Sequence, residues 1–121
     1  QCEILASDVF KLGVKGCPVK ESGKLEGSFP FEIIGPAGTV KKDKGLIIAW
    51  RHIHFDPASA ERFGVKDKDI VSLRVPGERA AVFENVICRV GPTHALECHI
   101  DFDEGNAVGI GNGAMGEVQK K

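Results

Sequence analysis

The chain has 121 residues, of which 42% are hydrophobic and 27% charged, proportions that fit one ordinary globular domain with a core of its own. Its net charge of −1 gives no basic field for nucleic acid or an anionic membrane, and no apolar run approaches the roughly 18 residues of a membrane span, so we expect neither partner. The four cysteines show no CxxC spacing, which argues against a zinc knuckle or a thioredoxin-like motif and favours reduced thiols in a cytoplasmic protein.

Short segments separated by glycine and proline make up the N-terminal part of the chain. Residues 7–13 predict a short helix that ends at a glycine. Residues 15–28 are predicted to be rich in loops, and residues 41–44 to form a charged turn on the surface. An apolar run, residues 45–50, leads into Arg-His-Ile-His at residues 51–54.

The C-terminal part begins with a second helix signal and continues with strands. In residues 56–64 an aspartate can cap a helix, a proline can take its first position and a glycine can close it. Strand-length runs rich in Val, Ile and Leu follow at residues 70–75, 80–83, 86–90 and 96–102, with turns at residues 76–78 and 84–85. This spacing predicts a mainly β protein, a small antiparallel β-barrel with short capping helices.

Two histidines one residue apart raise the question of a metal site. Residues i and i+2 of a strand point to the same face, so His52 and His54 would present their imidazoles side by side, with Arg51 and Ile53 on the other face. Such a pair often supplies two ligands to one metal ion. The alternative is a pair of surface histidines, or of core histidines held by hydrogen bonds.

A third histidine strengthens the metal interpretation. The alternation of residues 96–102 puts His99 on a polar face and Cys98 on an apolar face, so Cys98 is expected to pack inward and to be neither ligand nor nucleophile. In an open zinc site the protein commonly supplies three histidine ligands and leaves one coordination position free. Here two strands would supply the three histidines, and Glu97 and Asp101 could orient the imidazoles. His94 lies outside the pattern and is interpreted as a bystander. Cupins also use a histidine pair, but no glutamate follows His54 at their usual short spacing.

The segment GLIIAWRHIHFDPASA, residues 45–60, resembles the "RHIH…P.DA" segment of the PduL-type phosphate acyltransferases, the phosphotransacylases of propanediol and ethanolamine degradation. The resemblance continues through residues 63–67, 96–101 and 103–107, and upstream into residues 3–36. It covers nearly the whole chain, and the two histidine motifs at matching separation make it specific.

The resemblance implies an enzyme that moves a propanoyl or acetyl group between coenzyme A and inorganic phosphate. Its two metal ions, normally zinc, lie between two β-barrels. Carried over by position, His52, His54 and His99 resemble three ligands of one metal, and Glu3 resembles a fourth or bridging carboxylate. Lys20 stands where the family has an arginine that could contact phosphate or coenzyme A. A lysine keeps the positive charge for such a contact, but it cannot form the two parallel hydrogen bonds of a guanidinium.

Two further cationic features remain open. Arg51 precedes the histidine pair and is the better candidate for a catalytic anion contact, with a structural surface role as its alternative. Lys41, Lys42 and Lys44 could contact the phosphates of coenzyme A, although a solvated turn is the simpler interpretation.

The departures from the family suggest a partial enzyme. A second histidine pair and an upstream arginine are absent, and the chain starts at Gln1, so we expect the C-terminal part of a longer protein that is inactive by itself. Residues 1–48 would then be a segment of one barrel and residues 49–121 most of the second. Besides acyl-CoA and phosphate, the partners left open are the N-terminal portion, a second copy in a homodimer and a bacterial microcompartment shell, whose lumen is an alternative location to the cytoplasm. Alternative functions are a non-catalytic metal-binding module and a cupin-like metalloprotein.

Overall fold

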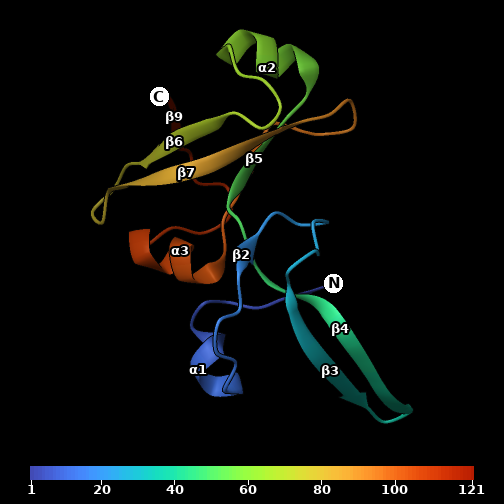
Figure 1. Cartoon of the computed structure of the whole chain (residues 1–121). Helices are drawn as coiled ribbons and strands as arrows, with labels where there is room; N and C mark the ends of the chain where they lie inside the picture. Colours follow the sequence, from blue (N-terminus) through green and yellow to red (C-terminus); the bar gives the residue numbers. More distant parts are fainter. The chain divides into compact units, whose positions relative to one another are not determined.

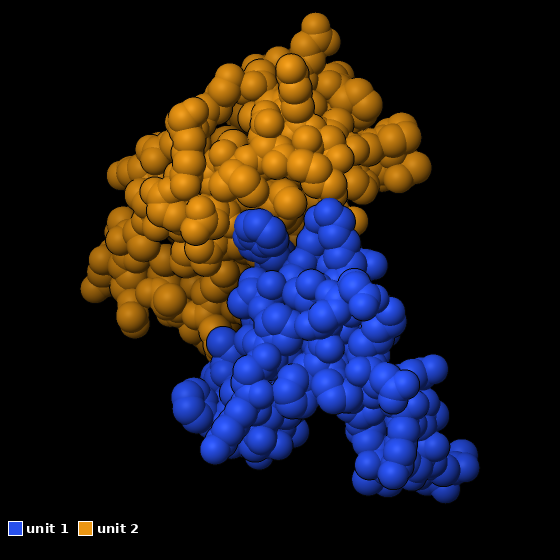
Figure 2. Space-filling view, in the orientation of Figure 1, with its two compact units in different colours: residues 1–50 blue, residues 51–121 orange.

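The computed structural model describes residues 1–121 and divides the chain into two compact units, Gln1–Trp50 and Arg51–Lys121, coloured separately in Figure 2. Strands predominate in both units, and the helices are three short ones (Figure 1). The prediction of a mainly β protein with short helices is therefore confirmed. None of the helices is long and apolar enough to cross a membrane.

Strand β4 (Gly38–Ala49) organises the first unit. It pairs with β1 (Cys2–Glu3) and β2 (Val19–Lys20) in parallel and with β3 (Phe29–Gly35) in antiparallel fashion. The predicted helix of residues 7–13 is confirmed as α1 (Asp8–Leu12), which ends at Gly13 with a left-handed φ of 64°. A side chain is disfavoured at that φ, which explains the glycine.

The predicted turn at residues 41–44 is wrong, because these residues lie inside β4. The chain reverses between Gly35 and Gly38 instead. Charged residues can occupy this strand because both faces of the β3–β4 ribbon are largely exposed. Lys41 lies opposite Glu32 in the register, with 3.9 Å between their charged groups, so the charges support the pairing.

The second unit holds a five-stranded sheet in the order β8-β5-β7-β6-β9. Its elements are β5 (His52–Phe55), α2 (Pro57–Phe63), β6 (Ile70–Val75), β7 (Ala81–Val90), β8 (Glu97–His99), α3 (Phe102–Val108) and β9 (Glu117–Lys120). Pairing is antiparallel except between β5 and β7, which are parallel. The expected purely antiparallel arrangement is therefore wrong, because the connection from β5 to β7 through α2 and β6 is long enough for a parallel pair.

The second unit contains the predicted helix and one predicted strand, but two other predicted strands are joined into one. Helix α2 has the predicted Asp56 cap, which accepts from the Ser59 amide, and the predicted Gly64 end. The strand at residues 70–75 and the turn that follows it are also confirmed. Residues 80–83 and 86–90 are not separate strands, since β7 runs through Asn85, which takes a positive φ of 55°.

The predicted strand at residues 96–102 is too long. It ends at His99, and Asp101 then caps α3 by accepting from the Glu104 amide, while the Glu104 carboxylate accepts from the Asp101 amide. This reciprocal capping box explains why the strand stops, and its signature, Asp followed three residues later by Glu, is present in the sequence.

The sheets are open in this chain. In the second unit β8 and β9 form the two edges and do not pair with each other. Closure into a barrel therefore stays a prediction.

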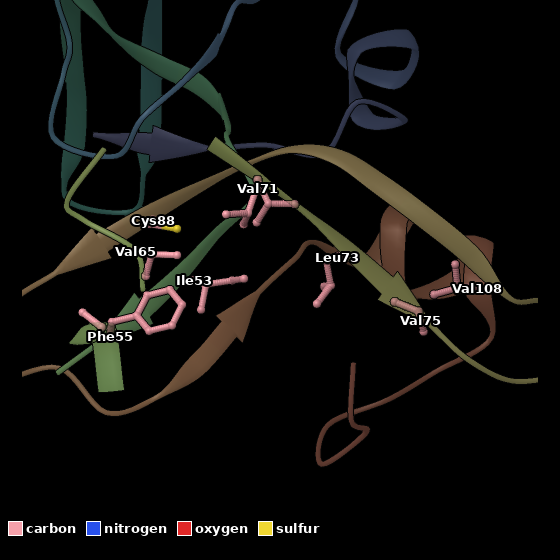
Figure 3. Close-up of a cluster of buried hydrophobic side chains, with 10 residues drawn as sticks. Ile53, Phe55, Val65, Val71, Leu73, Val75, Cys88 and Val108 are labelled. Atoms are coloured by element: carbon pink, nitrogen blue, oxygen red, sulfur yellow. The ribbon is translucent and has the colours of Figure 1, made fainter. Parts of the chain in front are cut away.

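The core of the second unit fixes the face on which the histidines lie. Ile53 and Phe55 of β5 are buried, with 2% and 0% of their surface exposed, and they alternate with His52 and His54. They belong to a cluster of buried side chains that includes Cys88 of β7 and Val71 of β6 (Figure 3). Burial of each large apolar side chain stabilises the fold by about 1.5–3 kcal/mol, so the register that directs the imidazoles to the other face is strongly favoured.

Candidate metal centre

Strand pairing brings three of the predicted ligands together. In the antiparallel register of β5 and β8, His52 lies opposite His99. The centroids of the imidazole rings are 4.9 Å apart for His52 and His54, 4.9 Å for His52 and His99, and 4.5 Å for His54 and His99. The expected sharing of one face is therefore present, while the role of these side chains as metal ligands stays a prediction.

His94 lies beside this group in space, although its interpretation as a bystander to metal binding stays a prediction. Its ring stacks on that of His54 with centroids 4.2 Å apart and an angle of 13° between the planes. Its Nδ1 lies 3.1 Å from the carbonyl oxygen of Arg89. The strand alternation could not reveal this contact, because His94 lies in the connection between β7 and β8. We call His52, His54, His94 and His99 the histidine cluster.

His54 lies in a strongly desolvating environment within the histidine cluster. Its Nε2 is buried and has no hydrogen-bond partner. Desolvation, reinforced by repulsion from His99, His94, His52 and Arg89, lowers the pKa of the His54 imidazole to about 4. The ring is therefore neutral near pH 7, as a metal ligand must be, and a buried nitrogen without a partner is a site that a metal ion could satisfy.

A carboxylate lies beside the imidazoles, where it can orient one of them or serve as a further donor. Glu97 Oε1 lies 3.0 Å from His99 Nε2, so the expected contact between this acid and an imidazole is present. One ligand atom each of His54, Glu97 and His99 lie within 4.8 Å of one another. Imidazole and carboxylate groups are donors that zinc prefers, so the residues fit a zinc ion. Asp101, which was also expected to accept a hydrogen bond from an imidazole, instead caps α3.

Arg51 is held by several partners on the second unit. Its Nη1 donates to Glu104 Oε1 at 2.9 Å, its Nε donates to the Glu84 carbonyl at 2.8 Å, and its guanidinium lies 5.3 Å from the centre of the Phe83 ring. Because Glu104 also caps α3, these contacts tie the start of β5 to that helix. They indicate a structural role, and an anion contact by Arg51 stays a prediction.

The remaining predicted site residues lie in the first unit. Glu3 is exposed on β1 and accepts a hydrogen bond from Gln1 Nε2 at 2.7 Å. Lys20 is partly buried on β2, opposite Ala49. Their roles as metal ligand and cofactor contact stay predictions. Lys44, one of three lysines that could contact the phosphates of coenzyme A, pairs with Glu26 at 2.7 Å.

Cys98 differs from its expected environment. It lies opposite Ile53, away from the His99 side chain, as the alternation predicts. However, the residue is exposed, so the prediction that it packs inward is wrong. The reason is that β8 is a short edge strand, and the apolar neighbour expected on its continuation, Phe102, begins α3 with 79% of its surface exposed. Desolvation, and secondly the Glu104 carboxylate, still raise the pKa of the Cys98 thiol to about 11.

Comparison with known families assigns the chain. A family model described as phosphate propanoyltransferase matches residues 1–111. The chain belongs to the phosphate propanoyltransferase family. The resemblance found in the sequence is thereby confirmed, and it rests on the segment that holds the histidine cluster as well as on the first unit.

Individual relatives carry the same name. Phosphate propanoyltransferases of Lachnoclostridium phytofermentans and Thermotoga maritima are each 51% identical to this chain, over 110 and 116 residues, which are 91% and 95% of it. That of Rhodobacter capsulatus is 48% identical over 120 residues, or 99% of the chain. These matches cover 51%, 55% and 55% of the three relatives, so the chain spans about half the length of the phosphate propanoyltransferases it matches.

Proposed function

We propose that this member of the phosphate propanoyltransferase family forms part of an enzyme that transfers a propanoyl or acetyl group between coenzyme A and inorganic phosphate. The family match and the names of the relatives support the reaction. The structural observation that carries the proposal is the histidine cluster, in which the buried Nε2 of His54 has no hydrogen-bond partner.

The proposed metal centre uses His52, His54 and His99 as ligands of one zinc ion, one of two in the complete enzyme. Glu3 is proposed as a fourth or bridging ligand. When bound, zinc supplies a Lewis acid that can polarise a carbonyl or phosphoryl oxygen. The chain's own contribution is to keep three imidazoles on one sheet face and to orient His99 through the Glu97 carboxylate.

Two cations are proposed to bind the anionic substrates. Lys20 offers a point charge to a phosphate group of coenzyme A or to inorganic phosphate. Arg51 offers a guanidinium that an anion would share with Glu104, its present partner at 2.9 Å. Because that ion pair also supports α3, we expect Arg51 to contribute more to the shape of the site than to direct anion binding.

The larger organisation is part of the same proposal. Residues 1–48 and 49–121 are proposed to belong to two barrels that close in the complete enzyme. The open edges of the sheet in the second unit support this idea, because an unpaired edge is usually covered or paired. We propose a cytoplasmic enzyme, with the microcompartment lumen as the alternative location, and a homodimer or a shell contact as further partners to test.

The experiment uses the complete gene product that contains this chain and measures phosphate-dependent release of coenzyme A from propanoyl-CoA and acetyl-CoA. We expect release to require zinc, to fall to background in His54→Ala, and to persist in the control Cys98→Ala. Full activity of His54→Ala, or of the metal-stripped enzyme, would contradict the metal-dependent proposal. Zinc binding without any release of coenzyme A would favour the metal-binding module.

A further inference from the structure

The ring of His94 lies against the backbone of Gly91. A Cβ atom added to Gly91 would lie 3.1, 3.2 and 3.3 Å from three atoms of that ring, Cε1, Nδ1 and Nε2. These nearly equal distances mean that the imidazole lies flat over the glycine, which makes room for it by having no side chain. A hydrogen bond of 3.1 Å from the His94 amide to the Gly91 carbonyl closes the turn between them.

A second contact fixes the edge of the same ring. A carbonyl oxygen only accepts, so the 3.1 Å contact between His94 Nδ1 and the Arg89 oxygen requires the hydrogen on Nδ1. Arg89 is also the residue of β7 that pairs with His54 of β5. The backbone that holds His94 is therefore the strand segment next to His54, which ties the two histidines to one rigid frame.

The stacking of His94 on His54 can restrict the rotation of the His54 ring. The planes of His54 and His94 differ by only 13°, with centroids 4.2 Å apart. His94 is not among the residues whose ligand atoms converge, which are His54, Glu97 and His99, and its Nδ1 hydrogen is directed to the Arg89 carbonyl. It is well placed to restrict the rotation of His54, whose Nε2 has no hydrogen bond to hold it.

We propose that His94 is a positioning residue that holds the imidazole plane of His54 for metal binding, with Gly91 and the Arg89 carbonyl as its own supports. The inference rests on the proposed metal centre and adds a residue to it. Groups that orient a metal ligand from outside the coordination sphere typically change metal affinity by about 10–100-fold, which sets the size of the expected effect.

Gly91→Ala offers a sharp test, because it changes no side chain of the histidine cluster. Its φ lies outside the left-handed range, so alanine strains no backbone angle there, and the added methyl group requires the His94 ring to shift by a few tenths of an ångström. Gly111→Ala is the matched control, since Gly111 also lacks a positive φ and a Cβ there meets nothing within 4 Å. His94→Ala removes the ring, and His94→Phe keeps a flat ring without the hydrogen bond.

The zinc dissociation constant of the full chain is measured by competition with a chromophoric chelator, and the ligand field by the visible spectrum of Co²⁺. We expect Gly91→Ala and His94→Ala to weaken zinc binding by about 10-fold or more, Gly111→Ala to match the wild type, and His94→Phe to bind more tightly than His94→Ala. In the metal-free chain, nuclear magnetic resonance should show that the ring protons of His54 lose an upfield ring-current shift in His94→Ala.

The outcomes separate the two proposals. A wild-type chain that binds no zinc overturns the metal centre and the role of His94 with it. A wild-type chain that binds zinc, with equal affinity in His94→Ala and Gly91→Ala, overturns the positioning role alone. If Gly91→Ala does not fold, the comparison of His94→Ala with His94→Phe decides by itself.

Discussion

His52 and His99 lie opposite each other across the β5–β8 pairing, with ring centroids 4.9 Å apart and an angle of 25° between the planes. This relationship joins a strand inside the sheet to a three-residue strand at its edge. A metal ion held by both residues would therefore connect the two strands as well as bind to the protein.

Zinc should stabilise β8 selectively. A short edge strand opens easily, and a ligand that binds only the closed form shifts that equilibrium. We expect zinc to slow hydrogen exchange of the amides of residues 97–99 more than that of the β3–β4 ribbon in the first unit. Exchange in β8 that does not change when zinc binds would contradict a metal bridge between His52 and His99.

The stability of the metal-free chain should depend on pH through His54. Its pKa is about 4 in the folded chain, against an ordinary value of 6.5, so between these values the unfolded chain takes up a proton that the folded chain does not. The His54 contribution is therefore fully present above pH 6.5 and is lost as the pH falls toward 4. Urea unfolding from pH 7.5 to 4 measures this loss.

His54→Asn supplies the control for that series, because asparagine does not titrate in this range. The difference in unfolding free energy between wild type and variant should narrow or reverse as the pH falls from 6.5 to 4. A difference that stays constant over this range would show that His54 is not held neutral by its surroundings.

Local patterns in the sequence predicted much of the second unit, for physical reasons that can be named. The alternation of β5 placed His52 and His54 on one face, because burying Ile53 and Phe55 fixes the register. Cap residues predicted α2 for the same kind of local reason. The stack of His94 on His54 could not be predicted, since it depends on the path of a connection and not on any period.

Two features of the second unit depend on contacts that apolar alternation and strand spacing do not describe. Apolar alternation after His99 favoured a longer strand, whereas the reciprocal hydrogen bonds of Asp101 and Glu104 begin a helix there. The parallel pairing of β5 with β7 is a tertiary feature that strand spacing alone cannot specify.

Cys98 should be unreactive at neutral pH although it is exposed. With a thiol pKa of about 11, very little of Cys98 carries the reactive thiolate at pH 7. We expect slow alkylation of Cys98 by iodoacetamide at pH 7, with a rate that keeps rising up to about pH 11. Rapid modification at pH 7, or loss of turnover in Cys98→Ala with zinc still bound, would support a thiol nucleophile instead.

Glu104 should be important for folding because it serves two partners. Its carboxylate caps α3 and pairs with Arg51, and only 20% of the side chain is exposed. Glu104→Ala should lower the free energy of unfolding by about 1–3 kcal/mol, the range for losing a cap together with a hydrogen bond to a charged group. Urea denaturation measures it, with the exposed helical Glu61→Ala as control. Equal stability of both variants would show that the contact contributes nothing.

Zinc held by imidazoles of the histidine cluster can be detected by X-ray absorption at the zinc edge of the zinc-loaded chain. We expect a coordination shell of nitrogen and oxygen at about 2.0–2.1 Å with the multiple scattering of about three imidazoles, and loss of bound zinc in His54→Ala. Sulfur scattering at about 2.3 Å would place zinc on cysteines instead. That result, or a chain that retains no zinc, would contradict a metal centre built from these histidines.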